Sequence, residues 1–146
     1  MTDIHDWVKT PRRVRWAFNL AEMQHSGDFY GTEPYINHPV RVFEMVRSAG
    51  LSESHQIVAL LHDVVEDTDA TIDDIYSRFG SLIATSVDAI TKRPGEPHEL
   101  YFARVMADDV AHTVKLFDST SNLLSSLLIR DQERIDRYLG YIAELS

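Results

Sequence analysis

Apolar residues recur every three or four positions along nearly the whole chain, which is the spacing of one face of an α-helix. Thr10 followed by Pro11 predicts a helix start, because a hydroxyl side chain caps the first turn and proline fits the first helical position. This helix is expected to run to about His25. No stretch shows the sustained polar and apolar alternation of a half-buried strand. The pattern therefore predicts an all-α fold.

The later helices are predicted from the same spacing and from residues that begin or end helices. Ser52 and Thr71 are suited to cap helix starts, while Gly50 and Gly80 end the helices before them. The segment HSGDFYGTEPYINHP holds two glycines and two prolines, so we expect an ordered loop there. The spacing predicts helices near residues 42–49, 72–79, 81–90, 98–109 and 111–128, and a last one through Ile135, Leu139 and Ile142.

The run IVALL is apolar on every helical face, which is typical of a central buried helix. It continues into LLHDVVEDT, where charged groups adjoin the apolar run and burial without a partner would cost several kcal/mol. On a continuous helix, His62 shares a face with Glu66, and Asp63 shares it with Glu66 and Asp67. A divalent metal ion explains these residues by pairing with imidazole and carboxylate together. A hydrogen-bonded His–Asp pair near a helix end is the other explanation.

Two more segments bear on this choice. His38 stands in YINHP at the start of its helix, where a lone histidine is also compatible with a packed or surface residue. A polar stripe follows one face of a later amphipathic helix, and an ordinary exposed face explains it equally well. If the stripe is a site, it places a carboxylate ligand beside a phosphate-binding lysine and two hydrogen-bonding groups. Its members are Lys115, Asp118, Asn122 and Ser125.

Composition and charge narrow the classes of function. The 146 residues fit one domain, 1–146, and the absence of cysteine excludes disulfides and thiolate chemistry. The net charge of -9 argues against nucleic-acid binding, and it suits a phosphorylated substrate only if a metal ion reverses the field locally. We find no apolar run typical of a signal peptide or a membrane span, so we expect a cytoplasmic protein.

Taken in order, the motifs resemble the HD-domain hydrolases of the RelA/SpoT type, specifically the small stand-alone hydrolases of the alarmone (p)ppGpp. The resemblance runs from about Trp16 to Leu128. Its landmarks are a helix ending in His25, then GTEPYINHPVRV, ALLHDVVEDTDATIDDIYSRFG, AITK, YFARV and VKLFDSTSN. The combination of PYINHP, HDVVEDT and VKLFD in this order is specific to that family. It implies a single HD-type helical bundle around the central buried helix, with no synthetase domain.

The resemblance also implies the site and its chemistry. The bound ion is usually manganese in this family, with other divalent metals left open. Glu66 and Asp67 are implied to position and activate the attacking water. The implied reaction acts on a small-molecule nucleotide and removes pyrophosphate from the 3′ position of the guanosine ribose. The implied metal ligands are His38, His62, Asp63 and Asp118.

Candidate substrate contacts follow from the same motifs. Lys115 is expected to offset phosphate charge, whereas Asn122 and Ser125 are expected to bind the sugar or a phosphate of the nucleotide. Lys92 and Arg104 are weaker candidates for phosphate contacts, and a solvated surface charge is the favoured interpretation of each.

The sequence departs from the family in the segment that helps to hold the nucleotide. Relatives usually carry an arginine and a neighbouring base in a pattern like HxGQxRxxGxPY, whereas HSGDFYGTEPY is one residue shorter and has no base. Ser119 stands where a basic residue often follows the aspartate. Phe29 or Tyr30 can stack on a purine, with a packing role as the alternative. A substitute basic patch, for which an exposed helix face is the favoured interpretation, would consist of Lys9, Arg12, Arg13 and Arg15.

Three hypotheses about function remain at this point. The leading one is a manganese-dependent (p)ppGpp 3′-pyrophosphohydrolase. The second is an HD phosphohydrolase that acts on another nucleotide or on a phosphorylated dinucleotide cofactor, which the missing bases favour. The third is a non-catalytic nucleotide-binding regulatory module, which predicts loss of a ligand or of the acidic pair, although all six residues are present. Homo-oligomerisation is left open.

Overall fold

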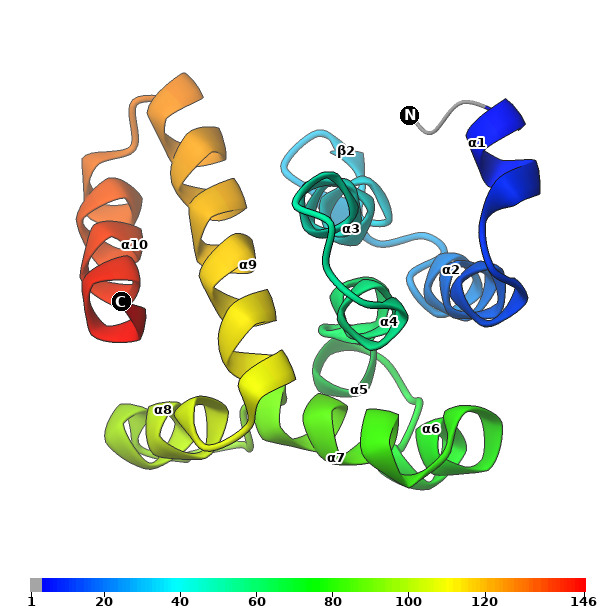
Figure 1. Cartoon of the computed structure of the whole chain (residues 1–146). Coiled ribbons are helices and arrows are strands. Elements are labelled where there is room, and N and C mark those ends of the chain that lie inside the picture. Colours follow the sequence, from blue (N-terminus) through cyan, green and yellow to red (C-terminus); the bar gives the residue numbers. More distant parts are fainter. Residues whose placement is uncertain (1–3) are drawn as a thin grey trace.

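Helices form nearly all of the fold, and the all-α prediction is confirmed. The computed structural model describes the backbone of residues 4–146 and the side chains of residues 7–146. Within these residues the other regular element is one antiparallel hairpin of two short strands. The elements, shown in Figure 1, are α1 Ile4–Lys9, α2 Arg12–Gln24, β1 Phe29–Tyr30, β2 Glu33–Pro34, α3 Asn37–Ser48, α4 Glu53–Leu61, α5 Val64–Asp67, α6 Ile72–Phe79, α7 Ser81–Ile90, α8 His98–Met106, α9 Asp109–Leu128 and α10 Gln132–Leu145.

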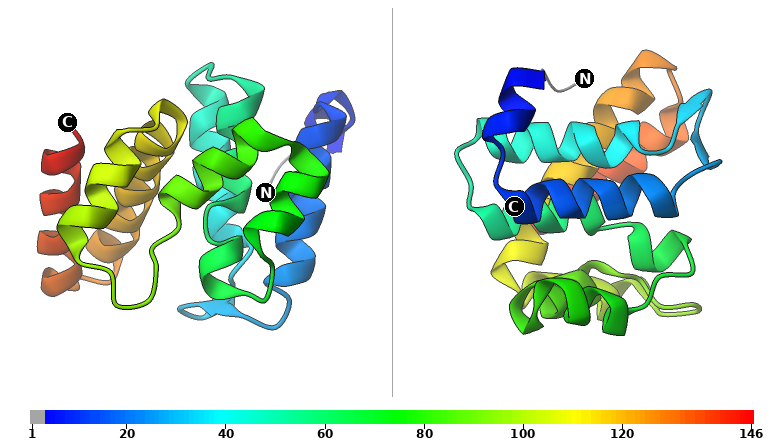
Figure 2. Two further views of the ribbon diagram at one scale, coloured as in Figure 1. Left: turned by 90° about the horizontal axis from the view of Figure 1, so that it is seen from below. Right: turned by 90° about the vertical axis from the view of Figure 1, so that its right-hand side faces the viewer.

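The predicted central helix is α4, which packs against α2, α3, α7 and α9. The five residues 57–61 have no exposed surface, as their apolar run predicts. Figure 1 shows α10, α9, α3 and α2 side by side, with α8, α7 and α6 running across one end. The left view of Figure 2 shows α9 beside α10 at one side of the molecule and α2 at the other, and the right view is seen from the α2 side. The main core therefore lies around α4.

A second, smaller cluster holds α8 and α10 against α9. It is formed by Tyr101, Phe102, Val105 and Leu145, which are buried together. The long helix α9 joins the two clusters, because its first half also contributes Ala111 to the main core. This dual packing fixes the axis of α9 relative to α3 and α4, which lie on its other side.

Two predicted helix starts are confirmed by their side chains. The Ser52 hydroxyl accepts a hydrogen bond from the His55 amide at the start of α4. Thr71 and Asp74 form a reciprocal capping box at the start of α6, with N–O distances of 2.9 and 3.2 Å. These caps satisfy amide groups that the first helical turn leaves without partners.

Other predicted boundaries were wrong by a few residues. Pro11 has ψ 145° and lies outside the helix, so α2 begins at Arg12 without a side-chain cap. The helix predicted to reach residue 49 ends at Ser48, and Ala49, the residue after it, is exposed. The Asp108 carboxylate accepts the Ala111 amide at 2.8 Å and starts α9 earlier than the apolar spacing indicated.

The helix through LLHDVVEDT is also not continuous. It is divided into α4 and α5, and the two residues of the HD pair stand between them. Asp63 has φ -106° and ψ -3°, in a sparsely populated backbone region that often holds active-site residues. The one-face argument for His62 and Glu66 therefore fails in its simple form, because a bend separates the two residues.

The predicted loop before α3 contains the hairpin. Phe29 pairs with Pro34 and Tyr30 pairs with Glu33, which leaves a two-residue turn. Gly31 begins that turn with φ 63°, a conformation that residues with a Cβ adopt at an energetic cost. The hairpin thus presents Tyr30 at a defined position instead of on an irregular loop.

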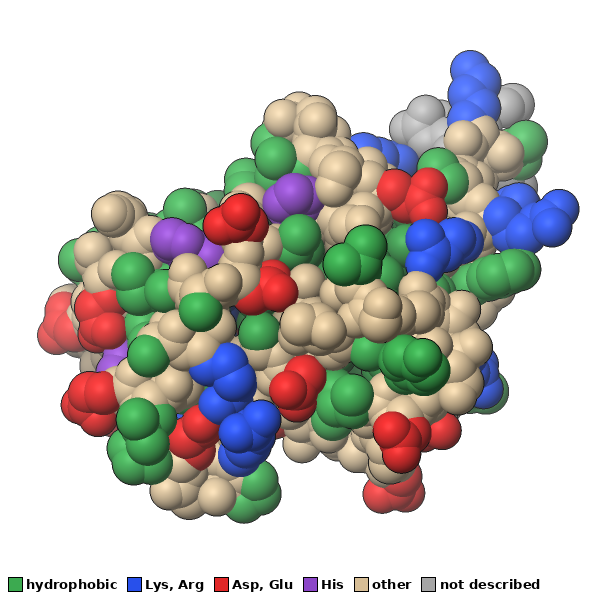
Figure 3. Space-filling view, turned by 60° about the horizontal axis from the view of Figure 1, so that its bottom comes forward, with side chains coloured by type: hydrophobic (Ala, Val, Ile, Leu, Met, Phe, Trp, Pro, Cys, Tyr) green, Lys and Arg blue, Asp and Glu red, His purple; other side chains and the backbone are tan. Residues whose placement is uncertain are grey.

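Charge is spread over the surface that Figure 3 shows, where acidic side chains alternate with basic and apolar ones. Basic side chains gather over the α1 and α2 end of this view, which matches the exposed Lys9 and Arg12. In the same cluster, Arg13 donates to the Phe79 carbonyl at 2.5 Å and packs α2 against α6. Among the described residues, we find no helix with the length and apolarity needed to cross a membrane.

Candidate metal centre and active site

All four predicted metal ligands lie together, although they come from three parts of the chain. His38 is on the first turn of α3, His62 and Asp63 stand between α4 and α5, and Asp118 is in the middle of α9. They meet because α3, α4 and α9 pack against one another. The two histidines and Asp118 are buried, with 2 to 4% of their surface exposed.

The donor atoms of these residues converge at short distances. Asp118 Oδ1 lies 2.9 Å from His38 Nε2 and 3.2 Å from His62 Nε2. Asp63 Oδ2 lies 3.1 Å from His62 Nε2 and 3.6 Å from His38 Nε2. Metal–ligand bonds of about 2.1 Å hold neighbouring donor atoms roughly 3 to 3.5 Å apart. Two imidazole nitrogens and two carboxylate oxygens in this arrangement fit one divalent ion.

His62 is oriented for such a role by the backbone. Its Nδ1 lies 2.6 Å from the Ala59 carbonyl, and an Nδ1–H donated there leaves Nε2 to face the carboxylates. Burial acts to lower the pKa of His62, but Asp63 and Asp118 outweigh it and hold that pKa well above its ordinary value. The two carboxylates therefore require a positive charge between them, which either a metal ion or a protonated His62 supplies.

Lys115 and Asn122, predicted to contact substrate, are both bonded to Asp118. Lys115 Nζ donates to Asp118 Oδ2 at 3.1 Å, and Asn122 Nδ2 donates to Asp118 Oδ1 at 3.2 Å. The amide oxygen of Asn122 accepts from the Tyr30 hydroxyl at 2.7 Å. Against the effect of burial, Lys115 and His62 keep the pKa of Asp118 well below its ordinary value. In this structure the two residues support the carboxylate.

The acidic pair lies beside the centre on the short helix α5. Ligand-type oxygens of Asp63, Glu66 and Asp67 all lie within 4.8 Å of one another. Glu66 and Asp67 are more exposed than the four predicted metal ligands. Desolvation raises the pKa of each of these two carboxyls, and the Lys92 amide, 2.7 Å from Glu66 Oε1, partly opposes this for Glu66. A carboxylate with a raised pKa is suited to accept a proton near neutral pH.

Tyr35 also lies in this candidate site, although the sequence predicted no role for it. Its hydroxyl lies 2.7 Å from Asp63 Oδ2 and 3.2 Å from Asp67 Oδ2, so it joins a predicted metal ligand to the acidic pair. Its ring packs against the buried His25, with ring centroids 4.7 Å apart. The sequence feature that could have indicated a role for Tyr35 is its position in PYINHP, three residues before His38.

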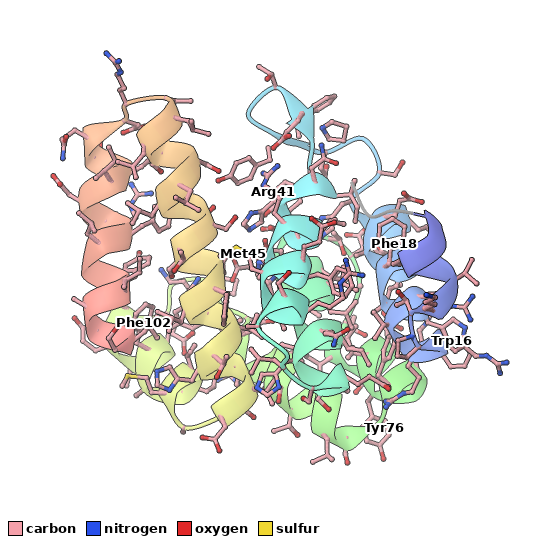
Figure 4. The ribbon with its side chains drawn as sticks, turned by 45° about the horizontal axis from the view of Figure 1, so that its top comes forward. Trp16, Phe18, Arg41, Met45, Tyr76 and Phe102 are labelled. Atoms are coloured by element: carbon pink, nitrogen blue, oxygen red, sulfur yellow. The ribbon has the colours of Figure 1, made fainter. Side chains whose placement is uncertain are left out.

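A cleft of 980 Å³ adjoins the centre between the hairpin, α3, α9 and α10. Tyr30 separates the two, because its ring stacks on the His38 ring with centroids 4.9 Å apart and an interplanar angle of 9°. Arg41 and Met45 lie on the side of α3 that faces α9 (Figure 4). The predicted contact Ser125 is half-buried in the cleft wall. Other lining residues include Phe29, Glu33, Ser121, Leu124 and Leu128.

Two arginines that sequence reasoning missed surround Tyr30. The guanidinium carbons of Arg41 and Arg134 lie 5.4 and 5.8 Å from the centroid of its ring. Arg134 Nη2 donates to the Tyr30 hydroxyl at 3.0 Å, and Arg41 Nη1 pairs with Glu33 at 2.6 Å. Nε and Nη2 of Arg41 have no hydrogen-bond partner among the described residues. No local pattern predicts this group, because Tyr30 and Arg134 are 104 positions apart.

Comparison with known proteins agrees with this geometry. The chain is 32% identical over 130 residues to the guanosine-3′,5′-bis(diphosphate) 3′-pyrophosphohydrolase of Aquifex aeolicus, covering 83% of this chain and 19% of the relative. It is 34% identical over 140 residues to the bifunctional (p)ppGpp synthase/hydrolase SpoT of Escherichia coli, covering 86% of this chain and 20% of that protein. The chain thus spans about a fifth of the length of these curated relatives.

A solved structure is similar over most of both chains. It is a metazoan ortholog of SpoT that hydrolyses ppGpp, with a TM-score of 0.78 and 25% identity, covering 93% of this chain and 84% of that one. The family model for the HD domain matches residues 17–109, a segment that contains three of the four clustered metal-binding candidates and the acidic pair. The chain therefore belongs to the HD domain family.

Proposed function

We propose that this chain is a metal-dependent hydrolase of (p)ppGpp that releases pyrophosphate from the 3′ position. The observation that carries the proposal is the convergence of His38, His62, Asp63 and Asp118 beside the exposed carboxylates of α5. Without a metal ion, Asp63 and Asp118 would depend on Lys115 and a protonated His62 for their compensating charge, and burying such charged groups is costly in a protein interior. The names of the similar proteins support the same substrate.

The four converging residues would hold the ion. When bound there, a divalent ion lowers the pKa of a water molecule and offsets charge on a phosphoryl group. We propose manganese, because a mixed set of imidazole nitrogens and carboxylate oxygens suits a metal of intermediate hardness. The Ala59 carbonyl accepts a hydrogen bond from His62, and Lys115 and Asn122 donate to Asp118; these bonds hold the side chains in place, as partners of metal-binding residues commonly do.

The chain's own acid–base chemistry is assigned to α5. Glu66 accepts the proton of the attacking water, and its raised pKa suits that task near neutral pH. The water oxygen bonds to the phosphorus attached to O3′ as the bond between that phosphorus and O3′ breaks, and the proton taken up by Glu66 is returned to O3′, which leaves as the 3′-hydroxyl of GDP. Tyr35 holds Asp67 relative to Asp63 through its hydroxyl, so Asp67 is positioned to orient the water.

The remainder of the nucleotide is assigned to the adjoining cleft. Arg134 and Arg41 supply the positive charge that the hairpin segment lacks, and both line the cleft. Ser125 offers a hydroxyl on the α9 side. Phe29 is 67% exposed and offers a ring face for a purine at the cleft edge. These assignments keep Ser125 as a predicted nucleotide contact and add Arg41 and Arg134 as two further contacts.

A second candidate is hydrolysis of another nucleotide, for instance a phosphorylated dinucleotide cofactor. The observation that favours it is the hairpin itself, where Asp28, Phe29 and Tyr30 replace the bases usual in the resemblance. A wall of aromatic rings is less selective for one nucleobase than a set of directed hydrogen-bond donors.

The two candidates are separated by a substrate panel. Metal-stripped protein is incubated with manganese and nucleotides including ppGpp, and products are resolved by ion-exchange chromatography. The expected products are GDP and pyrophosphate. Cleavage of a different nucleotide alone would retain the metal centre and change the substrate. No cleavage of any nucleotide would overturn the catalytic proposal and favour a nucleotide-binding module.

A further inference from the structure

The loop between α7 and α8 makes a direct contact with the acidic pair. The backbone amide of Lys92, in this loop, donates to Glu66 Oε1 at 2.7 Å. Among the described residues, no other group donates a hydrogen bond to the Glu66 carboxylate. Glu66 sits on a helix of only four residues, so its direction depends on what it is bonded to. The position of the loop therefore affects the position of the carboxylate.

Arg104, on α8, ties both ends of that loop. Its Nη2 donates to the Thr91 carbonyl at 2.7 Å, one residue before Lys92. The same nitrogen donates to Glu96 Oε1 at 2.9 Å, and Nη1 pairs with Glu96 Oε2. Glu96 Oε1 also accepts the Arg93 amide at 3.1 Å. One guanidinium group and one carboxylate thus hold residues on either side of the Lys92 amide.

The residues that anchor this loop to α7 and α8 are largely buried. The Tyr101 hydroxyl donates to the Ile90 carbonyl at 2.6 Å and fastens α8 to the end of α7. The guanidinium of Arg104 lies 5.6 Å from the centroid of the same ring. The side chains of Arg104 and Glu96 are 21% and 10% exposed, which is low for an ion pair on a loop. Charged groups held this way form a more rigid pair than exposed ones.

We propose that Arg104 and Glu96 are positioning residues for Glu66: they hold the loop so that the Lys92 amide directs the carboxylate toward the metal centre. This inference rests on the role of Glu66 in the proposed function. It differs from the phosphate contact considered for Arg104 from the sequence, because both terminal nitrogens of Arg104 are already bonded within the protein. Small displacements of a general base reduce rates strongly, so a support of this kind matters for turnover.

The structural part of the proposal is tested by hydrogen exchange of the Lys92 amide. The full chain is studied by NMR with Mg²⁺, which is diamagnetic. Arg104→Gln and Glu96→Gln are expected to accelerate Lys92 exchange at least about tenfold, the scale of losing one charge-assisted contact. Arg93→Gln is the control, because its exposed side chain lies in the same loop outside this pair. Unchanged exchange in both variants would overturn the proposal, and Glu96→Gln covers the case in which Arg104→Gln does not fold.

Kinetics then separate a positioning role from a merely structural one. Arg104→Gln should lower kcat roughly 10- to 100-fold, as loss of a supporting partner commonly does, with KM and Mn²⁺ affinity within about twofold. In a Glu66→Gln background the same change should have no further effect on kcat. An equal loss in both backgrounds would overturn the proposed route through Glu66. If the wild-type chain cleaves no nucleotide, the proposed function fails, whereas the exchange measurement still decides whether the pair holds the loop.

Discussion

The metal centre and the cleft beside it differ in how the chain builds them. The candidate metal centre consists of His38, His62 and Asp118, which are buried among packed helices, and of Asp63, whose side chain is 17% exposed. The cleft wall, formed by Tyr30, Arg41 and Arg134, consists of partly exposed side chains from the hairpin, α3 and α10. The first is held by the core of the protein, while the second depends on contacts between surface elements. The difference teaches that the proposed ion site and the proposed nucleotide site rest on separate parts of the fold.

The two regions are nevertheless connected by hydrogen bonds. Asp118 accepts from Asn122, Asn122 accepts from Tyr30, and the Tyr30 hydroxyl accepts from Arg134, at 3.2, 2.7 and 3.0 Å. Tyr30 also stacks on His38. Changes in the wall can therefore reach the metal centre through Tyr30, so variants must be measured for metal affinity as well as for turnover.

The largest expected effect comes from breaking the metal centre alone. Asp63→Ala removes one of the two carboxylates that face both imidazoles, and we expect manganese binding and hydrolysis to fall by roughly a hundredfold or more. Isothermal titration with manganese and the ppGpp assay measure the two losses. Circular dichroism serves as the folding control. Full turnover and metal binding in this variant would contradict the site assignment.

Glu66→Gln separates acid–base chemistry from ion binding. Glutamine retains an acceptor for the Lys92 amide but takes no proton, so we expect the rate to fall roughly 10²- to 10⁴-fold. Manganese affinity should stay close to the wild-type value, because Glu66 is outside the group of His38, His62 and Asp118. The comparison of kcat with the manganese dissociation constant checks both expectations. A parallel loss of metal affinity would instead make Glu66 a ligand.

Arg134→Gln tests the cleft wall without touching the metal centre directly. Loss of its charge should raise KM about tenfold, the scale of one charge-assisted hydrogen bond, and leave manganese affinity within about twofold. Arg137→Gln is the matched control, since Arg137 is one turn further along α10 and pairs with Glu133 on the surface. Equal KM values for the two variants would remove Arg134 from the nucleotide site.

The smallest expected effect is on the free energy of unfolding at low pH. It concerns the Arg104–Glu96 pair, which lies outside both the candidate metal centre and the cleft. The Arg104 guanidinium lowers the pKa of Glu96 from 4.5 to about 2. Because the pKa of Glu96 is lower in the folded chain, its carboxylate stabilises the fold at pH values above the pKa of the unfolded chain, about 4.5. This contribution is lost as the pH falls from about 4.5 to about 2. The free energy of unfolding of wild type should exceed that of Glu96→Gln by a constant amount above about pH 5. Urea titrations at several pH values would show that difference shrink on acidification, and a difference independent of pH would exclude the ion pair as its source.

Local patterns predicted much of the fold and of the centre. The caps at Ser52 and Thr71 and the buried run 57–61 depend on neighbours within one helical turn, so the printed sequence was enough to find them. The structure also brings together all the predicted metal-binding residues, whose role as ligands stays a prediction. The break at Asp63 was not predictable in this way, because the residues on both sides have a helical pattern.

By itself, the sequence determined the helical class, the central helix and the residue types at the metal centre, since these follow from periodicity, capping and motifs of adjacent positions. Only the tertiary structure decided which polar groups are already bonded within the protein. Lys115 and Asn122, whose substrate contacts stay a prediction, are bonded to Asp118, and Arg104 is bonded to the loop before α8. The tertiary structure also joined Tyr30 to Arg134. The physical reason is that side-chain partners distant along the chain are chosen by the packing of whole helices, which local spacing does not encode.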